Sequence, residues 1–487
     1  MGIMKTWLLI FAFLWTTVWG MAIGQGQGME YDLIVTDPWG ERIETGAKAV
    51  VTPGEVWISA EVASWYTNEK LIVSRPDKRL DVIITTPRFK LETPYLDDMV
   101  RNGVTLQFPL RLIHERPYVD LKTAGPVLGL IPVTHDSDKK VELLLTPREE
   151  KYHPQINQQR QPAPLAQPFN LVWDHVFSQS RNLAGEPVLP GMHVISPTWF
   201  AVVDDKGTIA SKGDRAYVAA AHQKNVQVWA LVSNSFNRDM TKSILANGQA
   251  QDNIIKQLVT YASLYNLDGI NLDFENVYDD DKDRLTAFVA KLGRALKEQK
   301  VTLSVDVTVP SAVPFWSPCY DRKELAKIAD YIMVMTYDEH WRLSPIAGST
   351  ASLPWVEKGI KAMLTEVPPQ KLLLGIPFYT RLWTESTSEA GTVTVKSQTL
   401  SMDQADKVIA DNDSPVVWLA DKGQHYTEYY RNGNRYRVWL EDKHSIALKA
   451  RLVPKYNLAG TAAWRRGFEK DEIWPVIAEA VQKNQTH

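Results

Sequence analysis

Cysteine is almost absent from this sequence, since Cys319 is the only one among 487 residues. A single thiol cannot close an intramolecular disulfide or build a cysteine-rich metal site. Stability must therefore come from packing. Hydrophobic residues make up 44% of the chain and charged residues 23%, which is ordinary for a soluble globular protein and excludes a mostly disordered chain.

An excess of charge of either sign is also absent. The chain has 54 basic and 57 acidic residues, which gives a formal net charge of -3. Proteins that bind nucleic acid through their backbone charge carry a basic excess, so nothing in this balance favours nucleic acid as a partner.

An apolar run near the N-terminus bears on localisation. A positive start at Lys5 leads into Trp7 to Val18, followed by small residues from Gly20 to Gly24. This layout predicts a secretory signal peptide over residues 1–24, cleaved after Ala22 or Gly24. An uncleaved membrane anchor is the alternative, but about 17 apolar residues are short for a membrane span. We expect a secreted or cell-envelope protein, and the N-terminal region is where any membrane association would lie.

Two segments of residues 28–147 repeat each other at an offset of 61. Val56–Ala63 aligns with Pro117–Ala124, and Asp77–Thr85 aligns with Asp138–Thr146. Each copy predicts a strand, a short helix and a closing strand pair, so two copies make a small α+β module. The pattern resembles the stalk-like, copper amine oxidase N-terminal-like domains of bacterial cell-envelope proteins. No metal-ligand spacing accompanies it, so the resemblance does not imply copper binding. Residues 148–168 are rich in Gln and Pro and predict a linker.

Residues 169–482 alternate short apolar runs with helical stretches. Such alternation is typical of a parallel sheet covered by helices, and eight units fit an α/β fold of the (β/α)8 TIM-barrel type, which needs about 250 residues. An insertion at 384–458 is expected between strands seven and eight as a small α+β subdomain. The expected strands are 170–177, 192–203, 226–236, 267–275, 301–309, 331–337, 372–379 and 460–464.

The fourth expected strand contains the chemically informative motif, Leu267-Asp-Gly-Ile-Asn-Leu-Asp-Phe-Glu-Asn276. Side chains alternate between the two faces of a strand, so Asn271, Asp273 and Glu275 share one face. In a barrel that face is the interior, and carboxylates at the C-terminal end of a barrel strand stand where such enzymes keep their catalysts. A structural ion-pair network or a metal site is the alternative for an Asp-x-Glu pair alone. Asp268 has the opposite parity and is expected to brace the turn below the site.

The motif Asp268-Gly-x-x-x-Asp273-x-Glu275 resembles the signature of glycoside hydrolase family 18, the chitinase-like barrels. Three further segments resemble that family in the expected order on strands six, seven and eight. They are Met335-Thr-Tyr-Asp338, Gly375-Ile-Pro-Phe-Tyr379 followed by Trp383, and Ala459-Gly-Thr-Ala-Ala-Trp464.

The resemblance implies a substrate-assisted retaining mechanism without a metal or other cofactor. Glu275 would protonate the glycosidic oxygen and then act as base toward water. Asp273 would orient the 2-acetamido group of the substrate, whose oxygen attacks the anomeric carbon, and Tyr337 would donate to that oxygen. The substrate must then carry an N-acetyl group.

The resemblance also implies a set of substrate-binding residues. Trp464 would form the floor of the sugar site. Asp338 lies just past a strand end, where a functional role is expected. Met335 and Tyr379 lie on barrel strands, where filling the core is the alternative to touching sugar. The expected substrate-binding set is Trp464, Asp338, Asn271, Met335 and Tyr379.

Asn271 departs from the family pattern, in which many members place an Asp two residues before the central one. Two adjacent carboxylates raise one pKa and share a proton, whereas an Asn is neutral. We therefore expect Asp273 to ionise more readily than in those members and the acid limb of the pH profile to be simple.

The variant motif, together with Tyr436–Ser445, looks closest to the bacterial branch of spore-cortex and cell-wall lytic enzymes. That resemblance implies an N-acetylglucosamine-containing polysaccharide as partner, in peptidoglycan or its fragments. Chitin or chitooligosaccharides are the alternative substrate. A non-catalytic, lectin-like barrel of the envelope is the alternative of another class, against which the presence of Glu275, Asp273 and Tyr337 argues.

Overall fold

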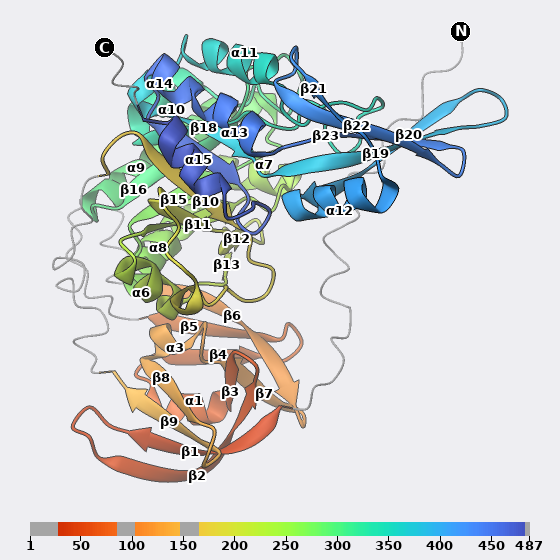
Figure 1. Cartoon of the computed structure of the whole chain (residues 1–487). Coiled ribbons are helices and arrows are strands. Elements are labelled where there is room, and N and C mark those ends of the chain that lie inside the picture. The colour runs from red at the N-terminus through yellow and green to blue at the C-terminus, as the bar shows by residue number, and fades with distance from the viewer. Residues whose placement is uncertain (1–27, 85–102, 147–164, 483–487) are drawn as a thin grey trace.

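The computed structural model describes residues 28–84, 103–146 and 165–482, and its centre is a closed barrel of eight parallel strands (Figure 1). Each strand pairs with the next in parallel, and the last closes on the first. The predicted (β/α)8 fold is confirmed. The barrel strands are β10 (Phe169–Asp174), β11 (Val194–Pro197), β14 (Gln227–Ser233), β15 (Gly269–Asp273), β16 (Thr302–Thr308), β17 (Tyr331–Met335), β18 (Leu372–Pro377) and β24 (Gly460–Trp464).

The second strand is shorter than predicted. The run 192–203 contains β11 and a separate strand β12 (Phe200–Val202), which forms a hairpin with β13 (Ile209–Ser211). Pro197 ends β11, and a proline has no backbone N–H to continue a sheet. β15 also ends earlier than the predicted 275, so Glu275 lies in the loop just beyond Asp273.

The two faces of the barrel strands have the predicted parity. Ile270, Leu272 and Phe274 belong to the core between the sheet and its helices, where Phe274 stacks on Phe288 with ring centroids 5.7 Å apart. The barrel interior holds a separate apolar cluster that includes Trp173, Trp229, Leu231 and Met333. Polar residues on the inward face must therefore find partners inside the barrel.

The covering helices follow the strands along the chain. Their apolar stripes pack on the outward faces of the strands, as amphipathic helices on a sheet do. They are α6 (Arg215–Gln223), α7 (Arg238–Ala246), α8 (Gly248–Tyr265), α9 (Lys282–Glu298), α10 (Arg322–Ile328), α11 (Leu353–Met363), α13 (Lys443–Ala450), α14 (Leu452–Tyr456) and α15 (Ile473–Ala480).

The N-terminal module repeats its elements at the offset seen in the sequence. β3 and β7 start at Glu55 and Arg116, and β5 and β9 start at Arg79 and Lys140. β3 and β7 pair with each other, which joins the two copies. The elements are β1 (Met29–Thr36), β2 (Arg42–Thr52), β3 (Glu55–Ser59), α1 (Ala60–Tyr66), β4 (Lys70–Ser74), β5 (Arg79–Ile84), β6 (Val104–Ile113), β7 (Arg116–Asp120), α3 (Gly125–Leu128), β8 (Leu130–His135) and β9 (Lys140–Leu145).

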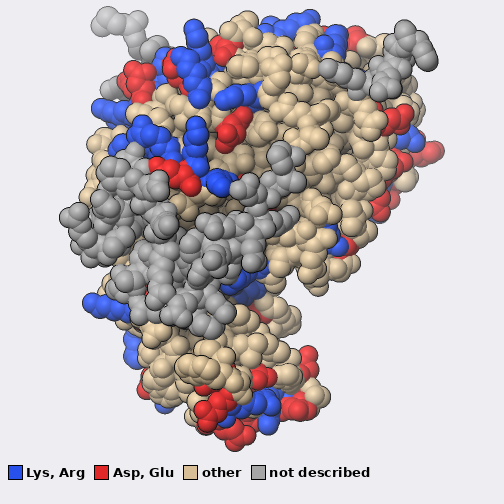
Figure 2. Space-filling view, turned by 90° about the vertical axis from the view of Figure 1, so that its left-hand side faces the viewer, with Lys and Arg blue, Asp and Glu red and all other residues tan. Residues whose placement is uncertain are grey.

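The module rests on the barrel beside α6 and β13 (Figure 1). The Tyr265 hydroxyl donates to the Thr123 carbonyl at 3.1 Å, and Lys122 forms an ion pair with Asp214 at 3.1 Å. On the face that Figure 2 shows, Lys and Arg lie among Asp and Glu at both ends of the molecule. The resemblance of the module to stalk-like domains stays a prediction.

A five-stranded antiparallel sheet projects sideways from the barrel between β18 and β24 (Figure 1). It begins at Tyr379 and its last strand ends at Trp439, so it overlaps the insertion expected at 384–458 and starts five residues before it. Its elements are β19 (Tyr379–Thr387), β20 (Val393–Ser401), α12 (Met402–Asn412), β21 (Val416–Leu419), β22 (Gln424–Arg431) and β23 (Asn434–Trp439).

Two sequence predictions concern residues that the structure leaves out in whole or in part. The signal peptide at 1–24 lies outside the described residues, as does most of the linker at 148–168. Within the described ranges, no helix is long and apolar enough to cross a membrane.

Closure of the barrel requires a glycine at position 460. Its φ is +154°, and a Cβ there would overlap the Phe169 carbonyl oxygen of the adjacent strand. We expect Gly460→Ala to lower the free energy of unfolding by about 3 kcal/mol or more, measured as a drop in the thermal midpoint. Gly391→Ala is the control, because Gly391 has a φ of +79° but no neighbour within 4 Å. It should cost only the backbone strain of roughly 1–2 kcal/mol, and equal losses in the two variants would contradict the packing argument.

Candidate active site

A cleft of ≈ 240 Å³ opens at the C-terminal ends of the barrel strands. Both carboxylates of the sequence motif line it, together with residues from or just beyond several other barrel strands and from the inserted sheet. The lining residues are Trp173, Leu231, Phe236, Asp273, Glu275, Asp306, Trp316, Met335, Tyr337, Asp338, Tyr379, Arg381, Thr399, Trp464 and Phe468.

Glu275 is held at the rim of the cleft by its main chain. The buried Asn234, just beyond β14, donates through Nδ2 to the Glu275 carbonyl at 2.7 Å and accepts from the Glu275 N–H at 3.2 Å. The next residue, Asn276, turns the chain with a φ of +56° and donates to the Phe236 carbonyl at 2.9 Å. The loop after β14 therefore positions the carboxyl group of Glu275.

Burial raises the pKa of Glu275 well above its ordinary value, and the nearby Asp273 and Asp338 carboxylates raise it further. A carboxyl group with such a pKa keeps its proton at neutral pH. That is the state that a general acid requires.

Asp273 lies deeper in the cleft and only 7% of it is exposed. Burial raises its pKa to about 7. Its Oδ1 atom is buried and has no hydrogen-bond partner among the residues that the structure describes. A buried carboxylate oxygen without a partner is costly, and a ligand N–H entering the cleft would satisfy it.

Asn271 lies beneath the cleft and does not line it. It is fully buried, and its Oδ1 accepts from Trp173 Nε1 at 2.7 Å and from Ser196 Oγ at 3.2 Å. Its Nδ2 donates to Asp306 Oδ1 at 2.7 Å. Asn271 thus connects β15 with the adjacent β16 and, across the barrel interior, with β10 and β11, and it supports Asp306.

Asp306 is a third carboxyl group in the site, beside Asp273 and Glu275. The motif strand has a neutral Asn271, but Asp306 on β16 brings another carboxyl group into the same site. Burial and the neighbouring Asp273 and Glu275 raise the pKa of Asp306 well above its ordinary value. Burial raises the pKa of Asp273 to about 7. The comparison with family members that carry an Asp at position 271 stays a prediction.

The segment after β17 and the first residue of β19 form one wall of the cleft, which holds Tyr337, Asp338 and Tyr379. The Tyr379 hydroxyl donates to Asp338 Oδ1 at 2.7 Å, and Arg381 Nη2 donates to the same oxygen at 2.6 Å. The Tyr337 ring meets the Tyr379 ring edge-on at 6.2 Å. Burial raises the pKa of Tyr337 well above its ordinary value, so its hydroxyl keeps the proton it could donate.

Trp464 and Met335 line the remaining sides. The Trp464 ring lies 6.0 Å from that of Trp173, which Asn271 fixes through its indole N–H. The predicted residues Glu275, Asp273, Tyr337, Trp464, Asp338, Met335 and Tyr379 therefore meet in one cleft. Their individual roles stay predictions.

Outside the cleft, Asp268 braces the lower end of β15 as predicted. Its Oδ2 accepts from the Val228 N–H at 2.7 Å and lies 2.8 Å from His222 Nε2.

Eight lining residues were not among the predicted site residues: Trp173, Leu231, Phe236, Asp306, Trp316, Arg381, Thr399 and Phe468. For Asp306 a signal was available, because Ser304, Asp306 and Thr308 repeat the inward polar alternation seen in β15. Arg381 comes from the inserted sheet, and Trp316 and Phe236 come from loops. The alternation of residues along a strand does not connect these three residues with the motif strand, so no signal in the sequence pointed to them.

Comparison with known proteins gives the family. The model of the glycosyl hydrolases family 18 matches residues 191–469, which is more than half of the chain. The chain belongs to family 18. It is a glycoside hydrolase by family, as its sequence motifs suggested.

Relatives of this family 18 chain include bacterial glycosylases. It is 25% identical over 300 residues to the uncharacterized glycosylase YvbX of Bacillus subtilis (strain 168), covering 60% of this chain and 85% of the relative. It is 24% identical over 281 residues to the cortical fragment-lytic enzyme of Bacillus anthracis, covering 56% of this chain and 64% of that enzyme. The match thus spans less than two thirds of the length of the cortical enzyme.

The solved structures that resemble this chain include a chitinase from Chromobacterium violaceum. That chain superimposes with a TM-score of 0.57 at 25% identity and covers 65% of this chain and 99% of its own. The likeness supports the barrel.

The buried Asp273 gives the family 18 site a stability that depends on pH. Its pKa of about 7 lies above the ordinary value of 3.8. The folded form therefore keeps a proton that the unfolded chain has already lost, and the free energy of unfolding falls as the pH rises from about 4 to about 7. We expect Asp273→Asn, which never ionises, to raise the thermal midpoint at about pH 8 and to change it little at about pH 4.

The control for this measurement is Asp205→Asn, because Asp205 is exposed. Its thermal midpoint should follow that of the parent chain at both pH values. An Asp273→Asn gain that is the same at pH 4 and pH 8 would show that ionisation is not the cause.

Proposed function

We propose that this family 18 chain hydrolyses glycosidic bonds of N-acetylglucosamine in peptidoglycan or its fragments, with retention of configuration. The observation that carries the proposal is the pairing of a protonated Glu275 with a buried Asp273 whose Oδ1 lacks a partner among the described residues. One group can give a proton, and the other can accept an amide N–H.

In the first step Glu275 gives its proton to the glycosidic oxygen as the bond to the anomeric carbon breaks. The acetamido oxygen of the substrate forms the new bond to that carbon, which yields an oxazolinium ion and the released sugar. Asp273 accepts from the acetamido N–H and offsets its growing positive charge. The Tyr337 hydroxyl donates to the acetamido oxygen and holds it in line for attack.

In the second step Glu275, now a carboxylate, removes a proton from water. The water oxygen bonds to the anomeric carbon, the bond to the acetamido oxygen breaks, and Glu275 regains its proton. The raised pKa of Glu275 favours both transfers, because the group is an acid in the resting site and a base after the first step.

The substrate class is supported by the relatives and by the architecture. The relative from Bacillus anthracis is named a cortical fragment-lytic enzyme. We propose that this chain is exported to the cell envelope, with the N-terminal module placing the barrel near its polymer. Chitin oligomers are the second candidate, favoured by the likeness to a chitinase fold.

Digestion of purified peptidoglycan and of chitin oligomers side by side tests the proposal. We expect reducing N-acetylglucosamine ends from peptidoglycan, and Glu275→Gln to lower kcat by about 10²–10⁴-fold. Glu389→Gln is the matched control, because Glu389 is exposed in the turn between β19 and β20. Release from chitin alone would select the second candidate. Binding of either polymer without cleavage by the parent chain would instead select a lectin-like barrel.

Asn271→Asp tests whether a carboxyl group at position 271 couples to the titration of the neighbouring carboxyl groups. An Asp at 271 would face Asp306 Oδ1, where the amide of Asn271 now donates at 2.7 Å. The added acid should raise the pKa of Asp273 further and move the acid limb of the kcat profile to higher pH by roughly one unit. Asn432→Asp, at an exposed position in the turn between β22 and β23, should leave the limb in place. An unmoved limb in Asn271→Asp would contradict the coupling.

A further inference from the structure

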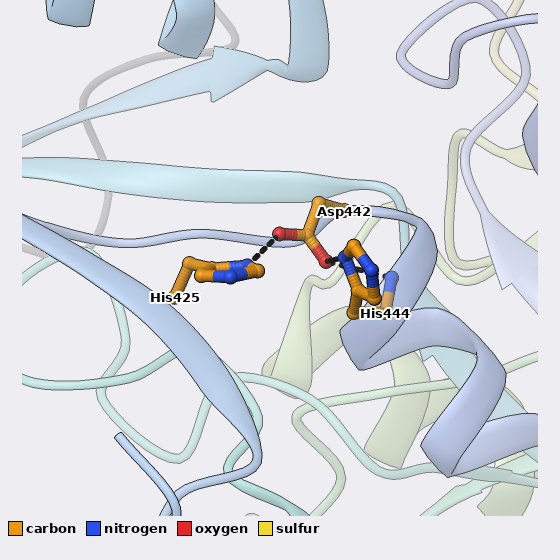
Figure 3. A group of neighbouring side chains, drawn as sticks. All are labelled: His425, Asp442 and His444. Atoms are coloured by element: carbon orange, nitrogen blue, oxygen red, sulfur yellow. Dashed lines mark hydrogen bonds and ion pairs between the residues drawn. The ribbon is translucent and has the colours of Figure 1, made fainter. Parts of the chain in front are cut away.

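A cluster of two histidines and one aspartate lies outside the cleft, where the inserted sheet meets the barrel helices. His425 is on β22, Asp442 caps α13, and His444 is in the first turn of that helix (Figure 3). One ligand atom from each of the three lies within 4.8 Å of the others. We propose that His425, Asp442 and His444 bind a divalent transition-metal ion of the zinc class.

The three ligands suit such an ion chemically. Imidazole nitrogen and carboxylate oxygen are ligands of Zn²⁺ at about 2.0–2.2 Å, and three protein ligands leave a fourth position for water. A hydrogen bond of 2.5 Å joins His425 Nδ1 and Asp442 Oδ2. Two ligands of a tetrahedral Zn²⁺ are roughly 3.4 Å apart. An ion that displaces the proton of this hydrogen bond therefore requires the two side chains to separate by only about 1 Å.

His444 completes the set with little rearrangement. Its ring meets that of His425 at 5.2 Å with an interplanar angle of 77°, and Figure 3 shows both rings next to the Asp442 carboxylate. His444 Nδ1 lies 3.9 Å from Asp442 Oδ1, and 60% of its side chain is exposed. An exposed ring can rotate toward an ion at low cost in packing.

The carboxylate is already oriented by the backbone. Asp442 Oδ1 accepts from the N–H groups of His444 at 2.8 Å and Ser445 at 3.0 Å, which leaves Oδ2 for the ion. Trp418 meets the His425 ring edge-on at 4.8 Å and restricts its rotation. Such outer contacts fix ligand direction in metal sites.

The two segments that supply the ligands are held together by their preceding residues. Gln424 Nε2 donates to Glu441 Oε1 at 2.9 Å, and the buried Lys449 pairs with Glu441 at 2.8 Å. The Leu440 N–H also donates to the His425 carbonyl at 2.8 Å. His425 and Asp442 follow directly on these contacts, so the site is preorganised before an ion arrives.

The ion would join β22 of the inserted sheet to α13 of the barrel. β22 pairs with β23, which pairs with β19, the strand that carries Tyr379 and Arg381 into the cleft. The ion is therefore a structural support of the cleft wall at a distance from the reacting groups. The inference does not depend on the proposed substrate.

Zinc titration of the full chain tests the site, with any affinity tag removed and metals stripped by a chelator beforehand. By calorimetry near pH 7.5 we expect one Zn²⁺ per chain and a rise in the thermal midpoint. His425→Ala, His444→Ala and Asp442→Asn should each weaken binding at least about tenfold and abolish the rise. Asp442→Asn is informative because Asn caps a helix as well as Asp, so the fold is kept.

Two controls locate the ion. His114→Ala, at an exposed histidine in the turn between β6 and β7, should bind Zn²⁺ as the parent does. Ni²⁺ should quench tryptophan fluorescence in the parent and much less in Trp418→Phe, because Trp418 adjoins His425. The proposal fails if the parent takes up no stoichiometric Zn²⁺, or if the three ligand variants bind it as tightly as the parent.

Discussion

The hydrogen bonds of Asn271 are the constraint on which the site depends. A closed barrel offers no water to the inward polar groups of its strands, so each must find a partner inside. Asn271 satisfies its amide with Trp173 on one side and Asp306 on the other. The bond to Asp306 ties β15 to the adjacent β16, and the bond to Trp173 ties it to β10 across the barrel interior. The next inward residues, Asp273 and Glu275, then lie at the open end where substrate can enter.

The same burial makes these carboxyl groups reactive and costly. Asp273, Glu275 and Asp306 share a small volume from which water is largely excluded, and the pKa of each is raised. A fold optimised for stability alone would place apolar residues there. The raised pKa values are therefore a sign of function. They give an acid that is protonated, and Asp273 adds an acceptor oxygen without a partner among the described residues.

Local sequence predicted the parts of the site that follow from the period of a strand. The parity of Asn271, Asp273 and Glu275, and the outward direction of Phe274, depend only on alternation within β15. Two other contacts depend on how neighbouring strands are staggered around the barrel. One places Asp306 beside Asn271, and the other is the hydrogen bond from Asn234 to the Glu275 main chain. Stagger is a property of the closed sheet, so the sequence of β15 alone does not show that Asp306 lies next to Asn271.

The inserted sheet takes part in the electrostatics of the cleft. Arg381 on β19 is almost fully buried, and its guanidinium donates to Asp338, whose carboxylate also accepts from Tyr379. Asp338 is one of the groups that raise the pKa of Glu275. A buried cation bonded to Asp338 keeps that carboxylate in place and tempers its field at Glu275. The position of β19 relative to the barrel, which the buried Glu441 and Lys449 help to fix, therefore bears on the acidity of a residue in a different strand.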